Sequence, residues 1–157
     1  MIVYHGSFKE VSKPDIFHSR RAVDFGPGFY VTPLFEQAVK WAEKFRRKQK
    51  EPFVSKYNFD ENAYNELKCL VFDEYSEEWL DYILNCRAGK SNDDYDIVTG
   101  GVANDKVFNT VELYFDGLIE KSEALNRLKY EKPNLQICFK TQKSIENYLV
   151  FQGSEIL

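Results

Sequence analysis

The chain has 157 residues, of which 43% are hydrophobic and 16% aromatic, with a formal net charge of −4 and a pI near 5.3. This length and apolar content predict a single folded domain over residues 1–157 and exclude a disordered chain. The negative net charge argues against a large nonspecific nucleic-acid surface, so no strong nucleic-acid partner is expected. The net charge does not exclude a local basic patch.

The cysteines and the amino terminus indicate where such a protein would reside. Cys69, Cys86 and Cys138 have no Cys-x-x-Cys spacing, and we expect reduced core thiols. Ile2–Tyr4 already has the pattern of a strand, which leaves no room for a signal peptide before it. No apolar run has the length needed to cross a bilayer. We therefore expect a cytoplasmic protein without a membrane partner.

The first part of the chain alternates short strands with one helix. Strands are expected at 2–4, 29–32 and 53–59, a loop at 8–21 and a helix at 33–49. The helix is favoured by apolar residues recurring at three- and four-residue spacing, namely Ala38, Trp41, Ala42 and Phe45. Its basic end, residues 44–50, complements the helix dipole, and a basic patch that faces a substrate is the alternative.

The second part mixes helices and strands, and the whole pattern predicts an α+β domain. Helices are expected at 76–87, 107–115, 122–128 and 141–148, and strands at 95–98, 135–139 and 149–151. Residues 67–72 fit either a strand or a helix, and the strand is favoured. Residues 60–66 predict a polar connection or a short helix. Ser122 is expected to cap its helix, and Gly100-Gly101 to form a tight loop close to the functional site.

Two glycine-containing stretches carry the strongest functional signal. Val3 to Ser7 is an apolar strand ending in His5-Gly6-Ser7, and Asp24 to Thr32 reads Asp-Phe-Gly-Pro-Gly-Phe-Tyr-Val-Thr. Glycine lets a backbone turn sharply and approach a ligand closely. Each stretch is a weak signal alone, but the pair about twenty residues apart is far less generic.

This pair resembles the first two motifs of the ADP-ribosyltransferases of the His-Tyr-Glu type, found in diphtheria toxin and the poly-ADP-ribose polymerases. The chain looks most similar to a small bacterial family of ADP-ribosyltransferase-like domains, the DUF3990 type, which shares a late strand like Asn134–Phe139. The resemblance implies split antiparallel β-sheets with a central NAD-binding cleft and flanking helices. It also implies NAD as the substrate that supplies ADP-ribose.

The resemblance assigns roles to several residues. His5 would bind a ribose hydroxyl, the Gly6 backbone would bind the nicotinamide amide, and Tyr30 would stack on nicotinamide. The other residues expected at the NAD site are Ser7, Arg20 for a phosphate, Gly28, and Trp41 as core or second stacking ring. His18 is expected at the surface.

Gln136 departs from the family pattern. On the late strand Leu135, Ile137 and Phe139 should share one face, and Gln136 should lie on the other, where the motif expects glutamate. An amide can bond a ribose hydroxyl but supplies no negative charge and no base. Asp105 is the first candidate for a compensating carboxylate, with a loop cap as its alternative.

The resulting hypothesis is a mono-ADP-ribosyltransferase that modifies a cellular macromolecule, with His5, Tyr30 and Gln136 as its catalytic set. The resemblance to compact free-standing transferases suggests a toxin with a neutralising antitoxin protein. The alternatives are a catalytically silent NAD- or nucleotide-binding module and an NAD glycohydrolase. A metal site is not expected, because the two histidines are far apart and belong to no Cys/His cluster.

Overall fold

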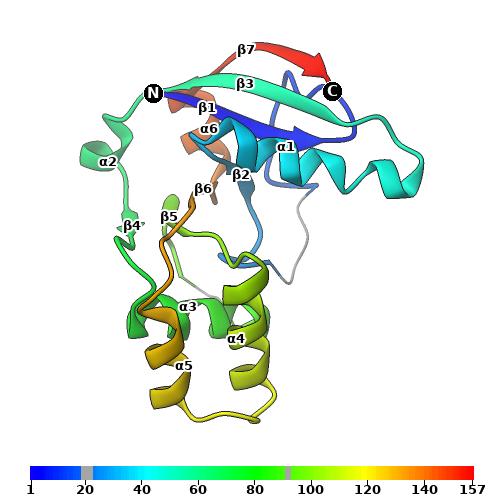
Figure 1. The fold of residues 1–157 in the computed structure, drawn as a ribbon. Helices are drawn as coiled ribbons and strands as arrows, with labels where there is room; N and C mark the ends of the chain where they lie inside the picture. Colours follow the sequence, from blue (N-terminus) through cyan, green and yellow to red (C-terminus); the bar gives the residue numbers. More distant parts are fainter. Residues whose placement is uncertain (19–22, 91–92) are drawn as a thin grey trace.

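The computed structural model describes residues 1–18, 23–90 and 93–157, and in them two β-sheets are accompanied by six α-helices (Figure 1). The helices are α1 (Phe35–Glu43), α2 (Ala63–Glu66), α3 (Glu77–Arg87), α4 (Asp105–Phe115), α5 (Lys121–Leu128) and α6 (Gln142–Tyr148), with a 3₁₀ turn, η1 (Arg46–Lys48). None of the helices in the described ranges is long and apolar enough to span a membrane.

The first sheet has the order β1-β3-β7 and is antiparallel throughout. Its strands are β1 (Ile2–Ser7), β3 (Phe53–Phe59) and β7 (Leu149–Ile156). The second sheet has the order β2-β6-β5-β4, with β2 (Phe29–Val31), β6 (Leu135–Phe139), β5 (Ile97–Gly101) and β4 (Cys69–Val71). Because β4 and β5 are parallel, the expectation of purely antiparallel sheets is wrong for this pair.

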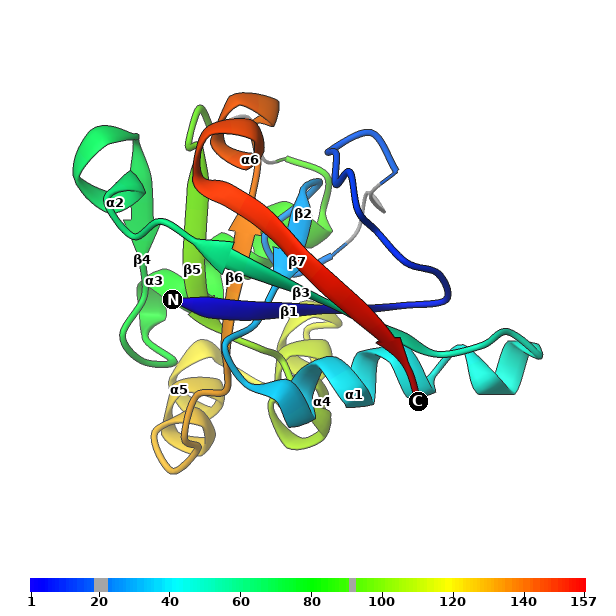
Figure 2. The same cartoon turned by 90° about the horizontal axis from the view of Figure 1, so that it is seen from above.

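The two sheets pack across each other, as Figure 2 shows from above. They are joined where Tyr4 and Thr32 exchange backbone hydrogen bonds of 2.8 and 2.9 Å. The core between them contains Val3, Phe29, Val31, Tyr57, Phe59, Ile97, Ile137 and Phe139. A second core lies on the other face of the four-stranded sheet, beside α3, α4 and α5, and includes Phe25, Tyr75, Trp79, Leu80, Val111 and Cys138.

Several expected elements differ in the structure for local reasons. The first helix ends at Glu43, and η1 follows as a separate turn that is capped at its C-terminal end by Gln49, whose φ of 57° is left-handed. Gly100 and Gly101 lie within β5 rather than in a loop. Glycine is needed at position 101 because a Cβ there would lie 2.3 Å from the Tyr75 ring. Glu120, not Ser122, precedes the fifth helix.

The other predicted features can be compared directly. The strands at 53–59 and 135–139 are confirmed with their exact bounds, and the expected faces of β6 are confirmed by the two cores. Within the described residues Cys69, Cys86 and Cys138 form no disulfide bond, and Cys86 and Cys138 lie in the core, whereas Cys69 is half-buried. His18 is exposed and pairs with Asp15, which confirms its surface position.

Candidate functional site

The end of β1 places His5 against the second sheet. The His5 ring lies 4.4 Å from the Phe29 ring between centroids, and its Nδ1 lies 2.7 Å from the Tyr30 carbonyl oxygen. A carbonyl oxygen can only accept a hydrogen bond, so Nδ1 donates and carries the proton of the neutral imidazole. Nε2 is then an acceptor, able to receive a hydrogen bond from a hydroxyl group.

Burial lowers the pKa of His5 below its ordinary value of 6.5, and the bond to Tyr30 opposes this shift only in part. Above pH 6.5 the folded and unfolded chains therefore both hold neutral imidazole. As the pH falls below that value, the unfolded chain binds the proton first. The His5 contribution thus reduces the free energy of unfolding on acidification, until the lower pKa of the folded state is passed.

We therefore expect wild type to lose stability faster than His5→Asn between pH 7 and pH 5, by at most about 1.4 kcal/mol per pH unit. Asparagine keeps a donor near the position of Nδ1 but does not titrate. Urea unfolding at a series of pH values measures the difference. Equal slopes for the two proteins would show that the folded state does not hold His5 neutral.

Gly6 lies where β1 meets α1. A Cβ atom at this position would lie 2.1 Å from the Ala38 carbonyl oxygen, 2.8 Å from the Ala42 nitrogen and 3.0 Å from Cβ of Trp41. Only glycine lets the strand approach the helix backbone this closely. Trp41 is half-buried on α1 beside Gly6, and Ser7 is buried at the end of β1.

Tyr30 closes the glycine-rich turn that precedes β2. Its hydroxyl donates to the Gly26 carbonyl oxygen at 2.5 Å and accepts from the Phe25 nitrogen at 3.0 Å, while its ring stacks on Phe25 with centroids 6.4 Å apart. Burial raises the pKa of Tyr30 well above its ordinary value, so the phenol stays neutral. Tyr30 thus has a structural role in shaping the turn, whatever else its ring contacts.

Gly28 serves the packing of the same turn against β6. A Cβ here would lie 2.4 Å from Sγ of Cys138 and 2.7 Å from the Phe139 carbonyl oxygen. The close approach that glycine permits at this position is therefore to the neighbouring strand. Burial also raises the pKa of the Cys138 thiol to about 12, which keeps it protonated and unreactive at neutral pH.

Gln136 lies in a buried polar network with an aspartate that starts the glycine-rich stretch. Its Nε2 donates to Oδ2 of Asp24 at 3.0 Å and to the Gly101 carbonyl oxygen at 3.3 Å, and the residue is only 4% exposed. Oδ2 of Asp24 also accepts from the Ala103 nitrogen, and Oδ1 pairs with Arg87 at 3.1 Å. A carboxylate is therefore present next to the amide.

Asp24 and Arg87 are the site residues that sequence reasoning missed. Asp24 opens the Asp-Phe-Gly-Pro-Gly stretch, but no pattern ties it to Gln136, which lies 112 positions away. Arg87 is the last residue of α3 and also pairs with Glu112 at 2.5 Å. A buried arginine needs a carboxylate partner, which is the only sequence signal that could have linked these residues.

The structure brings the predicted residues together in two groups. The carbonyl group of Tyr30 joins the two glycine motifs through His5, whereas Gln136 is joined to the start of the second motif through Asp24. Side chains alternate along a strand, so Tyr30 lies on the opposite face of β2 from Phe29, against which His5 packs. Arg20 lies outside the described residues, and Asp105 begins α4 but its side chain is not described.

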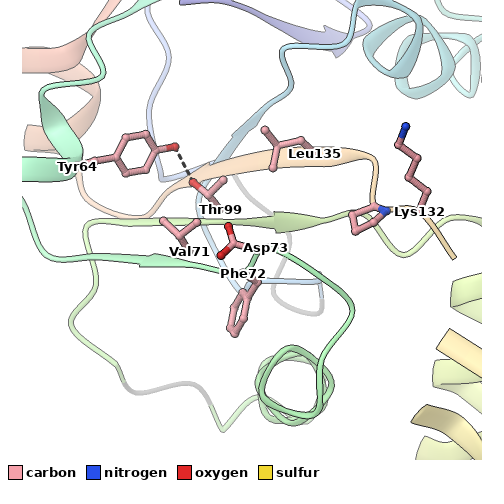
Figure 3. A pocket seen from close by; sticks show the side chains of 8 residues that line it. Tyr64, Val71, Phe72, Asp73, Thr99, Lys132 and Leu135 are labelled. Atoms are coloured by element: carbon pink, nitrogen blue, oxygen red, sulfur yellow. Dashed lines mark hydrogen bonds between the residues drawn. The ribbon is translucent and has the colours of Figure 1, made fainter. Parts of the chain in front are cut away.

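A pocket of about 520 Å³ opens beside the four-stranded sheet (Figure 3). It is lined by Tyr64, Val71, Phe72, Asp73, Thr99, Lys132, Pro133 and Leu135. The Tyr64 hydroxyl and Oγ1 of Thr99 are hydrogen-bonded at 2.8 Å, as the dashed line shows. These eight lining residues include none of the predicted site residues. In the described ranges no group of three or more His, Cys, Asp or Glu side chains could hold a metal ion.

Comparison with protein families shows a match over nearly the whole chain. Residues 1–151 match the family described as "Protein of unknown function (DUF3990)". Neither the curated proteins nor the solved structures contain a match to this chain. The family match covers both glycine motifs, the Asp24–Gln136 contact and the first three residues of β7.

Proposed function

The chain belongs to the DUF3990 family, and from its site we propose that it is a mono-ADP-ribosyltransferase that transfers ADP-ribose from NAD to a cellular macromolecule. The observation that carries the proposal is the orientation of His5. The Tyr30 carbonyl oxygen, 2.7 Å from Nδ1, fixes the neutral imidazole so that Nε2 is an acceptor. This is the role that the resemblance gives to a histidine that binds a ribose hydroxyl.

The proposed reaction breaks the bond between nicotinamide and ribose and forms a bond from ribose to a nucleophile. Nicotinamide leaves as a neutral amide, the ribose passes through an oxocarbenium-like state, and the nucleophile loses a proton. His5 orients the ribose by accepting a hydrogen bond from its hydroxyl group. Gln136 has no charge, and the carboxylate bonded to its amide is Asp24, whose Oδ2 lies 3.0 Å from Nε2 of Gln136 and whose Oδ1 is paired with Arg87.

One observation favours a second candidate, the silent NAD- or nucleotide-binding module. The amide nitrogen of Gln136 already has two acceptors, and the Tyr30 hydroxyl already has a donor and an acceptor. Groups that are saturated within the protein have less capacity to act on a substrate. An NAD glycohydrolase, which would transfer ribose to water, is the third candidate.

Incubating the protein with NAD labelled in its adenylate part and a cell extract separates the three candidates. Label on a macromolecule supports transfer, free ADP-ribose alone supports hydrolysis, and binding without turnover supports the silent module. In the toxin form of the proposal, deletion of a neighbouring antitoxin gene should stop growth. Normal growth after the deletion would count against an antitoxin.

For the transferase we expect His5→Ala to reduce labelling by about 100-fold, because the ribose loses an oriented hydrogen-bond partner. His18→Ala is the matched control, since His18 is exposed and pairs with Asp15 at the surface. It should label at the wild-type rate. Equal labelling by His5→Ala and wild type would remove His5 from the site.

A further inference from the structure

The segment that follows α1 forms a basic surface, and we propose that it binds single-stranded nucleic acid through the phosphate backbone. The basic surface comprises Lys9, Lys48 and Lys50, which lie near the rings of Phe8 and Phe45, together with the exposed Lys44 and Arg47 on either side of Phe45 and Arg46 in the chain. The proposal concerns binding alone and does not depend on whether the protein consumes NAD.

Charge is concentrated in this segment to an unusual degree. Residues 40–50 contain six Lys or Arg residues and one Glu, a net charge of +5, in a chain whose net charge is −4. The other 146 residues therefore carry a net charge of −9. A helix dipole accounts for one or two cations in a last turn, but not for a run that extends past the end of the helix. Such a local excess attracts a polyanion even though the whole chain is acidic.

The backbone of the segment has a fixed shape. After α1 ends at Glu43, the nitrogens of Lys48 and Lys50 bond the Phe45 carbonyl oxygen at 3.0 and 3.1 Å. Arg46 ties the turn to the domain, since Nε lies 2.6 Å from Oε2 of Glu43 and the guanidinium also donates to the Leu157 carbonyl oxygen at 2.9 Å. Arg46 thus acts as an anchor.

The remaining cations are available for a ligand. Within the described ranges, none of the five cations of the basic surface makes an ion pair, and all five are exposed. Nζ of Lys50 lies 4.0 Å from the centroid of the Phe8 ring, and Nζ of Lys48 lies 5.9 Å from that of Phe45. The two rings are themselves 5.2 Å apart. Ammonium groups are therefore held around an aromatic pair before any partner binds.

The aromatic pair favours nucleic acid over an acidic protein as the partner. Phe8 is 38% exposed, and a base can stack on a ring beside phosphate-binding cations. Figures 1 and 2 both place the end of α1 and the turn after it at one end of the molecule, beyond the strands. Phe8 and Lys9 directly follow Ser7 of β1, so the basic surface begins where the strand that carries His5 ends.

The test measures binding of a fluorescein-labelled single-stranded RNA of about 16 nucleotides to the full chain without NAD, by fluorescence anisotropy. With four to five phosphates neutralised, affinity should fall about 100-fold between about 50 and 200 mM salt. The K44Q/R47Q/K48Q/K50Q variant should bind about 30-fold more weakly at the lower salt concentration and lose most of the salt dependence. Phe8→Leu should weaken binding about tenfold by removing a stacking surface.

The matched control is K13Q/K90Q/K106Q/K129Q, which removes the same charge from exposed lysines elsewhere. It should bind within about twofold of wild type if the site is local. Equal weakening by the two quadruple variants would overturn the proposal, because binding would then follow net charge. Absence of RNA binding, or displacement of the RNA by polyglutamate as readily as by unlabelled RNA, would overturn it too. Since NAD is absent, failure here leaves the NAD-labelling result unaffected.

Discussion

Asp24→Ala is expected to reduce the free energy of unfolding by about 3–5 kcal/mol, because the largely buried Arg87 then keeps only the partly exposed Glu112 as its partner. The side chains of Asp24 and Arg87 are 15% and 12% exposed. The same change removes the acceptor for the Gln136 amide and the Ala103 nitrogen. Buried donors without acceptors add to the loss. Urea unfolding measures it.

Two further variants test whether the buried ion pair is the cause. Glu112→Gln removes the other partner of Arg87. Because the Glu112 side chain is 40% exposed, this change should reduce the free energy of unfolding by about 1 kcal/mol or less. In a double-mutant cycle, Asp24→Ala combined with Arg87→Met should cost less than the sum of the two single changes, by about 2 kcal/mol. Additive losses would mean that Asp24 and Arg87 do not stabilise each other.

Gly6→Ala is the second change with a large expected effect, a loss of about 3 kcal/mol. The new methyl group would overlap the backbone of α1, at 2.1 Å from the Ala38 carbonyl oxygen, and backbone cannot move aside as a flexible side chain can. The helix must then move away from β1. Since Gly6 adjoins His5, the same shift should lower labelling by NAD, and parallel unfolding and labelling measurements follow both effects.

Gly117→Ala separates steric overlap from backbone strain. Gly117 has a left-handed φ of 74°, but a Cβ there would meet no atom within 4 Å. The free energy of unfolding of Gly117→Ala should fall by about 1 kcal/mol, which is the cost of the left-handed backbone conformation alone. If Gly6→Ala reduced the free energy of unfolding no more than Gly117→Ala does, β1 would not pack on α1 as closely as described.

Strands with strong local patterns could be predicted from the sequence. Residues 53–59 alternate apolar and polar side chains, and β3 has those bounds. In β6 the alternation also placed Gln136 on the opposite face from Ile137, which the two cores confirm. Local pattern determines these features because each strand has one face on each side of the sheet.

Features that depend on distant partners could not be predicted. The sequence Gly100-Gly101 predicts a tight loop, but in the structure the absence of side chains at these two positions makes room for the rings of Phe25, Phe72 and Tyr75. The hydroxyl of Tyr30 bonds its own turn, a contact that no local pattern indicates. The parallel pairing of β4 with β5 and the contact of Asp24 with Gln136 likewise arise only when the sheets assemble.

The strand order also has a consequence for synthesis on the ribosome. β1, made first, pairs with β3, but the far edge of β3 pairs with β7, and β2 pairs with β6. Neither sheet can be completed until residues 135–156 have left the exit tunnel. A nascent chain would therefore hold His5 early but acquire an assembled site only after residues 135–156 have emerged, which would delay any activity until that point.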